Sequence, residues 1–144
     1  MNERILLVDD DRSLLDATQA ILLRSGYHVV GFSDPEEALT TFRRAPEKWD
    51  LVLTDRSMPR LSGEELAWSI LQTRDDIPII MATGFSDEAD EQRARQIGIK
   101  EFVFKPIVGN DLLLAVRRAL ARAERSAASR AAEVTEPAVS SSAG

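Results

Sequence analysis

The sequence predicts an α/β fold in which helices cover both faces of a parallel sheet. Apolar runs alternate with segments of helical periodicity five times along the chain, which is the pattern of successive strand–helix units. Such units connect parallel strands through right-handed crossovers. The 144 residues suit one domain with a single core, which we place at residues 1–125.

Five short apolar runs are the expected strands, and they lie at 4–8, 28–32, 51–54, 79–82 and 101–104. The third run, Leu51–Thr54, is apolar almost throughout, as expected for a strand that is covered on both faces. The second, His28–Phe32, is less apolar. Its histidine is the only one in the chain, which excludes a histidine-based triad and a site with several histidine ligands.

The segments between the strands are the expected helices, at 13–25, 35–44, 64–73, 86–97 and from 110 or 111 onward. Asp34 followed by Pro35, with Glu37 three residues after the capping aspartate, is typical of a helix start. Other expected boundaries are helix stops at Gly26 and Gly98, and caps at Ser86 and at Asn110 or Asp111.

The last predicted helix changes in composition along its length. Its apolar stripe includes Leu113, Leu114, Val116 and Leu120. Arginines at 117, 118, 122 and 125 form a basic stretch that we interpret as a solvated helix face. From about Ser126 the chain is rich in Ala and Ser, so we expect residues 126–144 to extend the helix briefly and then form a flexible tail.

The composition restricts the classes of function. A net charge of −6 and a pI of about 4.9 argue against a domain that binds nucleic acid or a membrane surface. Cysteine is absent, which excludes disulfides and thiolate metal sites. No apolar stretch is long enough to span a bilayer, and charged residues from Glu3 to Asp9 interrupt any signal peptide. We therefore expect a protein of the cytoplasm.

Polar side chains follow four of the predicted strands at the point where each strand ends. Asp9 and Asp10 follow the first strand and Asp55 the third, while Thr83 and Lys105 follow the fourth and fifth. In parallel strands these ends meet at one edge of the sheet, which is where open α/β folds bind ligands. The sequence therefore predicts a site made of three carboxylates, a hydroxyl and an ammonium group.

This set of groups suits a divalent cation and a phosphoryl group. The adjacent carboxylates of Asp9 and Asp10 repel each other unless a cation lies near them, and Mg²⁺ binds few carboxylates while keeping several waters. Aspartate can also be a nucleophile that forms an acyl phosphate. Lys105 would then neutralise one phosphoryl oxygen as a point charge, and the Thr83 hydroxyl would bond another. Asp11 is the expected start of the first helix rather than a metal ligand.

Four segments together resemble the receiver domain of two-component response regulators. They are Val8–Asp10, Thr54–Gly63 with its Met58-Pro59 pair, Met81–Gly84 and Phe104–Pro106. Their order is that of the family, and the resemblance covers about residues 3–124. It implies a flavodoxin-like fold: a doubly wound five-stranded parallel sheet in the order 2-1-3-4-5 with five helices, in three α/β/α layers.

The resemblance implies a role for each residue of the site. Asp55 would be the phosphoacceptor, taking a phosphoryl group from the phosphohistidine of a sensor histidine kinase or a histidine phosphotransfer protein. Mg²⁺ would be the cofactor, bound by Asp9, Asp10, Asp55 and the backbone carbonyl of Ser57. Thr83 and Lys105 would contact the phosphoryl group, and the Lys105–Pro106 peptide bond would be cis. Such a domain catalyses only its own phosphorylation and dephosphorylation, so we do not expect an enzyme.

The family also implies a switch that couples Thr83 to an aromatic residue on the fifth strand, here Phe102. Phosphorylation would attract the Thr83 hydroxyl, let the ring turn inward and reshape the face formed by the fourth helix, fifth strand and fifth helix. Because Phe102 lacks a hydroxyl, a switch that depends on one is excluded. Many receivers form homodimers through this face, and the sequence does not decide whether this chain does. We expect no contact of this domain with nucleic acid or membrane.

Two alternatives use the same residues. A phosphatase of the haloacid-dehalogenase type would use Asp9 as the nucleophile with Mg²⁺, and it needs an acidic pair after the fourth strand, where Thr83-Gly84 stands. A receiver that has lost phosphorylation is not supported, since all five core residues are present.

Within the receiver hypothesis, bulky Phe85 would shield the acyl phosphate from water. Whether the domain acts alone or belongs to a larger regulator or hybrid kinase is not decided by the sequence.

Overall fold

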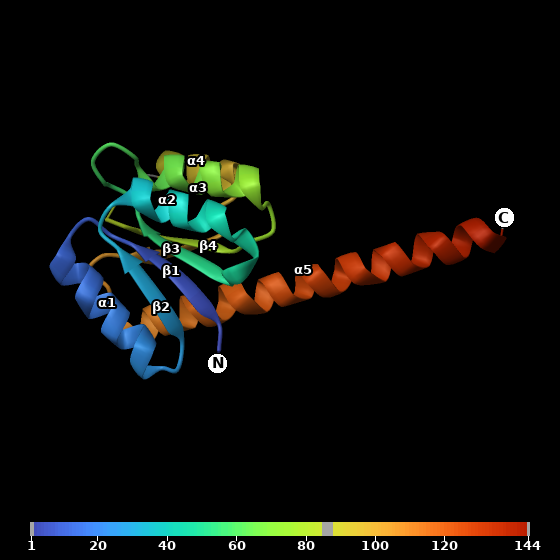
Figure 1. Ribbon diagram of the computed structural model, residues 1–144, viewed down its shortest axis with the longest axis horizontal. Coiled ribbons are helices and arrows are strands. Elements are labelled where there is room, and N and C mark those ends of the chain that lie inside the picture. The colour runs from blue at the N-terminus through green and yellow to red at the C-terminus, as the bar shows by residue number, and fades with distance from the viewer. Residues whose placement is uncertain (1, 85–87, 144) are drawn as a thin grey trace.

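The computed structural model describes residues 2–84 and 88–143, with the backbone alone from 133 onward. Its five parallel strands form one sheet in the order β2-β1-β3-β4-β5 (Figure 1). The strands are β1 (Arg4–Val8), β2 (His28–Phe32), β3 (Leu51–Asp55), β4 (Ile79–Thr83) and β5 (Glu101–Phe104). The fold class and the strand order implied by the family resemblance are confirmed.

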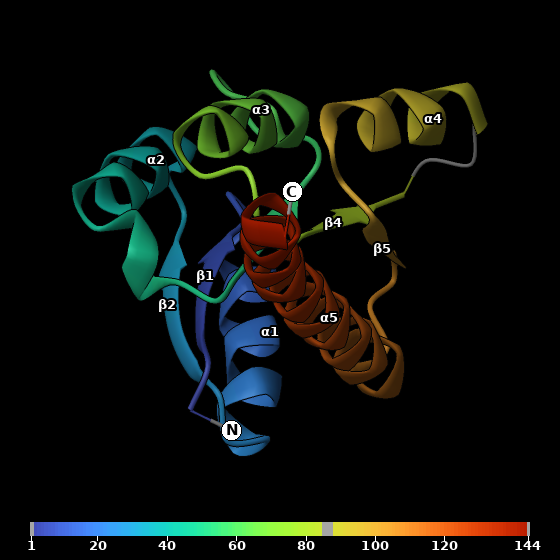
Figure 2. The same cartoon turned by 90° about the vertical axis from the view of Figure 1, so that its right-hand side faces the viewer.

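Helices cover both faces of the sheet. They are α1 (Arg12–Arg24), α2 (Pro35–Arg44), the short 3₁₀ helix η1 (Pro46–Lys48), α3 (Gly63–Thr73), α4 (Glu88–Ile97) and α5 (Gly109–Ala143). Figure 2 shows α2, α3 and α4 on one face and α1 and α5 on the other, which gives the three predicted layers.

Two apolar clusters attach the helices to the sheet, one on each face. Along β1, Leu6 and Val8 belong to the cluster under α2, α3 and α4, while Ile5 and Leu7 belong to the cluster under α1 and α5. Successive side chains of a strand point to opposite faces, so a strand covered on both sides is apolar at every position. Burial of each such side chain contributes about 2 kcal/mol to folding.

The parallel register aligns the carboxyl ends of the strands. Val8 at the end of β1 lies beside Thr54 of β3, and Thr83 at the end of β4 lies beside Phe104 of β5. The residues that follow these strands therefore emerge together at one edge of the sheet, as the sequence predicts.

The predicted caps of α2 and α5 can be compared with the structure, and that of α4 cannot. Asp34 caps α2 as predicted, and its carboxylate accepts a hydrogen bond of 3.0 Å from the Glu36 amide. The prediction that Asn110 or Asp111 caps the last helix is wrong, because α5 begins at Gly109. The proposed cap Ser86 lies outside the described residues.

The buried face of α5 matches the prediction in part. Val116 is buried and Leu113 and Leu120 pack partly buried against the same cluster, whereas Leu114 is 47% exposed. The buried positions are Leu112, Ala115, Val116 and Ala119. These four positions follow helical spacing, and two of them are alanines, whose small side chains allow the helix to approach the sheet closely. A prediction that considers only bulky apolar residues does not identify Ala115 and Ala119 as part of the buried face.

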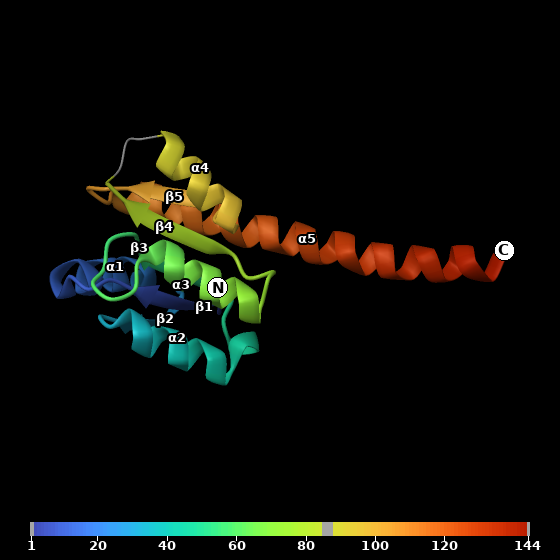
Figure 3. The same cartoon turned by 90° about the horizontal axis from the view of Figure 1, so that it is seen from above.

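α5 continues far past the sheet (Figure 1, Figure 3) and is helical to Ala143, further than the brief extension that the sequence predicts. Residues 127–133 are mostly alanine, arginine and glutamate, which are strong helix formers, and this accounts for the continuation of the helix past Ser126. The flexibility of residues 126–144 stays a prediction. No helix in the described part of the chain is long and apolar enough to cross a membrane.

The basic stretch of α5 is more than a solvated face. Arg118 and Arg122 form ion pairs with the buried carboxylate of Glu101 in β5, at 3.6 and 3.3 Å. Arg130 lies 3.8 Å from Asp76, in the loop before β4. Part of the arginine set therefore attaches α5 to the sheet.

Candidate functional site

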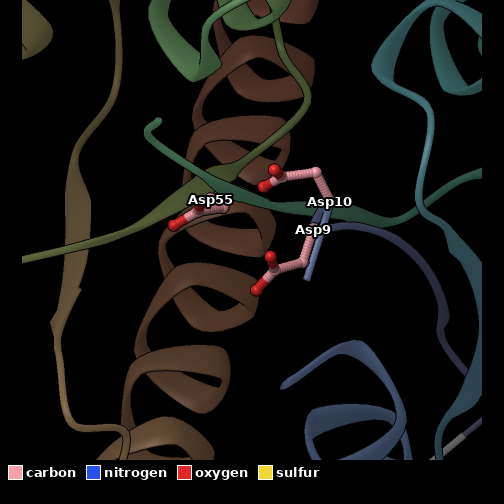
Figure 4. A group of neighbouring side chains, drawn as sticks. All are labelled: Asp9, Asp10 and Asp55. Atoms are coloured by element: carbon pink, nitrogen blue, oxygen red, sulfur yellow. The ribbon is translucent and has the colours of Figure 1, made fainter. Parts of the chain in front are cut away.

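Three carboxylates lie together at the carboxyl edge of the sheet. Asp9 and Asp10 follow β1 and Asp55 ends β3, and one oxygen from each lies within 4.8 Å of the others (Figure 4). The side chains of Asp9 and Asp55 are buried, whereas that of Asp10 is exposed. The cluster therefore has two fixed, buried acids and one that faces solvent.

Backbone hydrogen bonds hold Asp9 in place. Its amide donates to the carbonyl of Phe32 at 3.0 Å, and its Oδ1 accepts from the amide of Asp11, also at 3.0 Å. The Asp11 carboxylate in turn accepts from the amides of Ser13 and Leu14 and caps α1, as the sequence predicts. Asp11 thus serves the helix and orients Asp9.

The environment of Asp9 is unfavourable for a lone negative charge. Burial raises the pKa of the Asp9 carboxyl to about 6, although the hydrogen bond from Asp11 opposes this shift and the nearby charge of Asp55 reinforces it. A bound cation would relieve that cost, because it favours the ionised form of each surrounding carboxylate.

Lys105 supplies the positive charge of the site. Its Nζ lies 2.6 Å from Oδ1 of Asp55. Burial alone would lower the pKa of Lys105, but the hydrogen bond to Asp55 and the charge of that carboxylate outweigh it, so the pKa lies above its usual value. The Lys105 amide also donates to the carbonyl of Thr83 at 2.9 Å, and the Lys105–Pro106 peptide bond is cis, as the family resemblance implies.

Gly63 determines how the loop after β3 closes, a role that sequence reasoning missed. The Gly63 amide donates to the carbonyl of Arg56 at 2.8 Å. A Cβ on Gly63 would overlap the carbonyl oxygen of Asp55 and lie 2.9 Å from Cα of Arg56. The glycine is therefore required by the close approach of α3 to the backbone of the acidic residue. Ser62 and Glu65 then start α3 with a reciprocal capping box.

The remaining predicted residues lie near the cluster with less direct evidence. Thr83 is buried at the end of β4, between Asp55 on one neighbouring strand and Lys105 after the other. Ser57 is exposed in the loop two residues after Asp55. The use of its carbonyl as a metal ligand stays a prediction.

Phe102 is half-buried on the side of the sheet that α4 covers. The guanidinium carbon of Arg95 in α4 lies 4.9 Å from the centre of its ring, within the range of a cation–π contact. The ring is therefore in contact with α4, but its role as a switch stays a prediction. The proposed shield Phe85 lies outside the described residues.

Arg56, which follows Asp55 directly, makes two ion pairs beside the site that the sequence did not predict. Its Nε lies 3.1 Å from Glu64 at the start of α3, and its terminal nitrogen lies 3.3 Å from Asp90 in the first turn of α4. Nothing in the local sequence signals these pairs, because the partners are 8 and 34 positions away and meet only in the folded chain.

The donor set fits a hard cation. Carboxylate oxygens are the ligands that Mg²⁺ prefers, and Mg²⁺ usually retains several waters beside one or two of them. Asp9, Asp10 and Asp55 provide such a partial shell, open on the exposed side of Asp10. Among the described residues this is the only group of three or more potential metal ligands.

Comparisons with known proteins agree with this geometry. Residues 5–117 match the family model "Response regulator receiver domain". The chain is 36% identical over 129 residues to the "Alkaline phosphatase synthesis transcriptional regulatory protein PhoP" of Bacillus subtilis, covering 90% of this chain and 53% of that protein. It is 33% identical to the "DNA-binding response regulator MtrA" of Mycolicibacterium smegmatis, covering 86% and 53% respectively.

Solved structures give the same result. A response regulator receiver domain from Clostridium thermocellum superposes with a TM-score of 0.80 at 30% identity, covering 85% of this chain and 97% of that one. The chemotaxis protein CheY4 of Vibrio cholerae superposes with a TM-score of 0.77 at 26% identity, covering 83% of this chain and all of that one. The chain spans about half the length of the curated relatives described above.

Proposed function

Because the chain belongs to the response regulator receiver domain family, we propose that Asp55 accepts a phosphoryl group from the phosphohistidine of a sensor histidine kinase or a histidine phosphotransfer protein. The observation that carries the proposal is the pairing of buried Asp55 with Lys105 at 2.6 Å, beside two further carboxylates at the same sheet edge. The receiver domain is part of two-component signalling, and the acceptor role of Asp55 is the specific step proposed.

In the proposed step an oxygen of the Asp55 carboxylate attacks phosphorus, the bond from phosphorus to the histidine nitrogen breaks, and an acyl phosphate forms. The Lys105 ammonium moves from the carboxylate to a phosphoryl oxygen, where it offsets developing charge. Mg²⁺, held by Asp9, Asp10, Asp55 and the Ser57 carbonyl, would neutralise the other phosphoryl oxygens.

The output of the module would be a change of shape at its surface. The Thr83 hydroxyl turns toward the phosphoryl group, and the space left beside it admits the ring of Phe102. The face made by α4, β5 and α5 then binds a partner, an output domain or a second copy of the chain. The module acts in the cytoplasm, transforms no other substrate and, given its net charge of −6, makes no contact of its own with nucleic acid.

The phosphatase alternative has no observation in its favour. It requires Asp9 as the nucleophile, whereas the lysine of the site pairs with Asp55. It also requires an acidic pair after β4, where Thr83 and Gly84 stand.

Intact-mass measurement after incubation with acetyl phosphate and Mg²⁺ tests the proposal. We expect one phosphoryl adduct on the wild-type chain, which does not form when EDTA removes the metal before the phosphodonor is added and which is absent from Asp55→Asn. Asp75→Asn, an exposed aspartate in the loop before β4, is the matched control and keeps the adduct. A wild-type chain without an adduct from any phosphodonor, or an adduct that persists in Asp55→Asn, contradicts the proposal.

A further inference from the structure

Arg56 connects the phosphorylation loop to the first turns of two helices. It lies between Asp55 and Ser57, and its guanidinium is shared between Glu64 of α3 at 3.1 Å and Asp90 of α4 at 3.3 Å. All three side chains are about one-fifth to one-quarter exposed. A planar guanidinium can hold two carboxylates in fixed directions, which a compact ammonium cannot.

The backbone of Arg56 is fixed as firmly as its side chain. Its amide donates to the carbonyl of Ala82 in β4 at 3.0 Å, and its carbonyl accepts from the Gly63 amide at 2.8 Å. The absence of a side chain on Gly63 permits this approach. One residue thus joins the end of β3 to the end of β4, the start of α3 and the start of α4.

These contacts differ from those of an ordinary surface ion pair. An exposed pair contributes little, because solvent screens it and two long side chains lose freedom. Here the charges are partly withdrawn from water, and each acid lies in the first turn of a helix, where the helix dipole already favours a negative charge. The ion pairs of Arg56 with Glu64 and Asp90 are therefore expected to hold the three side chains in one arrangement.

We propose that Arg56 is a positioning residue for the site, which sets the affinity for Mg²⁺ by holding the Asp55–Ser57 backbone against the first turns of α3 and α4. The inference rests on the proposed function, because the Ser57 carbonyl matters only if it is a metal ligand. The positioning works through rigidity: without the guanidinium, the loop loses its side-chain link to α3 and α4, and only the backbone hydrogen bonds of Arg56 still hold the segment that carries the Ser57 carbonyl. The same link ties α4 to the residue next to the phosphoacceptor.

Mg²⁺ titration by isothermal calorimetry tests this in the absence of any phosphodonor. We expect Arg56→Met, which keeps the length of the side chain but removes its charge, to raise the Mg²⁺ dissociation constant about three- to tenfold. Loss of a residue that bonds a metal ligand directly typically weakens metal binding about tenfold or more, and Arg56 acts less directly. Arg56→Lys restores part of the affinity, because one of the two acids can still be paired.

Asp90 provides a test of the path and Arg93 a matched control. Arg93 in α4 also pairs with Asp90 but contacts that acid from its own helix. We expect Arg93→Met to bind Mg²⁺ as wild type does, Asp90→Asn to weaken binding, and the double variant Arg56→Met/Asp90→Asn to be no weaker than Arg56→Met alone. Thermal unfolding without Mg²⁺ verifies that each variant is folded.

Each remaining outcome overturns the inference. Folded Arg56→Met with wild-type affinity for Mg²⁺, or an equal loss in Arg93→Met, shows that Arg56 does not position the site, while the adduct on Asp55 leaves the proposed function standing. A wild-type chain that neither binds Mg²⁺ nor forms the adduct overturns both.

Discussion

The substitution Gly63→Ala tests whether close contact between α3 and the phosphorylation loop holds the site together. The new Cβ would lie 2.9 Å from Cα of Arg56 and 3.2 Å from the carbonyl carbon of Asp55, and it would overlap the oxygen of that carbonyl. Real side chains begin ordinary contact at 3.4 Å, so the helix start and the loop must separate by roughly 1 Å.

The expected cost follows from three contributions. Overpacking of a tight site costs about 1–3 kcal/mol. Separation of the segments also weakens the hydrogen bond from the Gly63 amide to the Arg56 carbonyl, worth about 1 kcal/mol. Alanine at the start of α3 recovers about 0.5 kcal/mol through its better helix propensity. We therefore expect Gly63→Ala to lower the free energy of unfolding by about 1.5–3.5 kcal/mol.

Urea unfolding followed by tryptophan fluorescence measures this change, since Trp49 is buried in the core. Gly84→Ala is the matched control, because a Cβ there meets no atom of the described residues within 4 Å. Its stability should stay within about 0.5 kcal/mol of wild type. Displacement of Asp55 should also weaken Mg²⁺ binding in Gly63→Ala but not in the control.

The reasoning would be refuted by a Gly63→Ala chain as stable as wild type with an unchanged slope of free energy against urea. Such a result would mean that α3 and the loop can separate at no cost, and that the glycine does not fix the site. Equal losses in both glycine variants would also refute it, because steric contact distinguishes only Gly63.

Three further predictions concern the acids and the helix caps. The raised pKa of Asp9 means that the folded chain binds a proton more tightly than the unfolded chain, so without Mg²⁺ the contribution of Asp9 to stability falls as pH rises from about 4 to about 6. In urea unfolding, Asp9→Asn should therefore gain stability relative to wild type across this pH range. Saturating Mg²⁺ should make the wild-type chain the more stable of the two. Ser62→Ala removes the capping box of α3 and should cost about 1 kcal/mol in the same assay, whereas a change much below this would show that the cap is dispensable. Glu101→Gln leaves Arg118 and Arg122 without their carboxylate and should lower the free energy of unfolding by about 1 kcal/mol. Glu124→Gln, on the exposed part of α5, should leave it unchanged, and equal effects of the two substitutions would argue against a specific attachment of α5.

Much of the fold was predictable because its signals are local. β1, β2 and β5 have the predicted bounds, since apolar runs of strand length end sharply at polar residues. The start of α5 and the small buried residues of its inner face were not predictable in this way. Burial of Ala115 and Ala119 depends on how closely the helix approaches the sheet, which is a property of packing rather than of residue type.

The candidate site likewise has features that the sequence predicts and features that depend on the folded structure. The sequence determined that Asp9, Asp10, Asp55 and Lys105 share one edge, because the carboxyl ends of parallel strands always meet there. It did not determine that Lys105 pairs with Asp55 or that burial raises the pKa of Asp9, since both depend on distances and solvent exclusion in the folded chain.

Only the tertiary structure decided the surroundings of that edge. Nothing in the sequence links Arg56 to Glu64 or Asp90, yet folding brings both carboxylates within 3.3 Å of the Arg56 guanidinium. Gly63 looks like loop punctuation, yet its missing side chain lets the backbone of α3 touch that of Asp55. Local sequence encodes which chemical groups reach the site, whereas contacts between residues far apart in the chain fix their distances, because those contacts exist only after the helices and strands have packed.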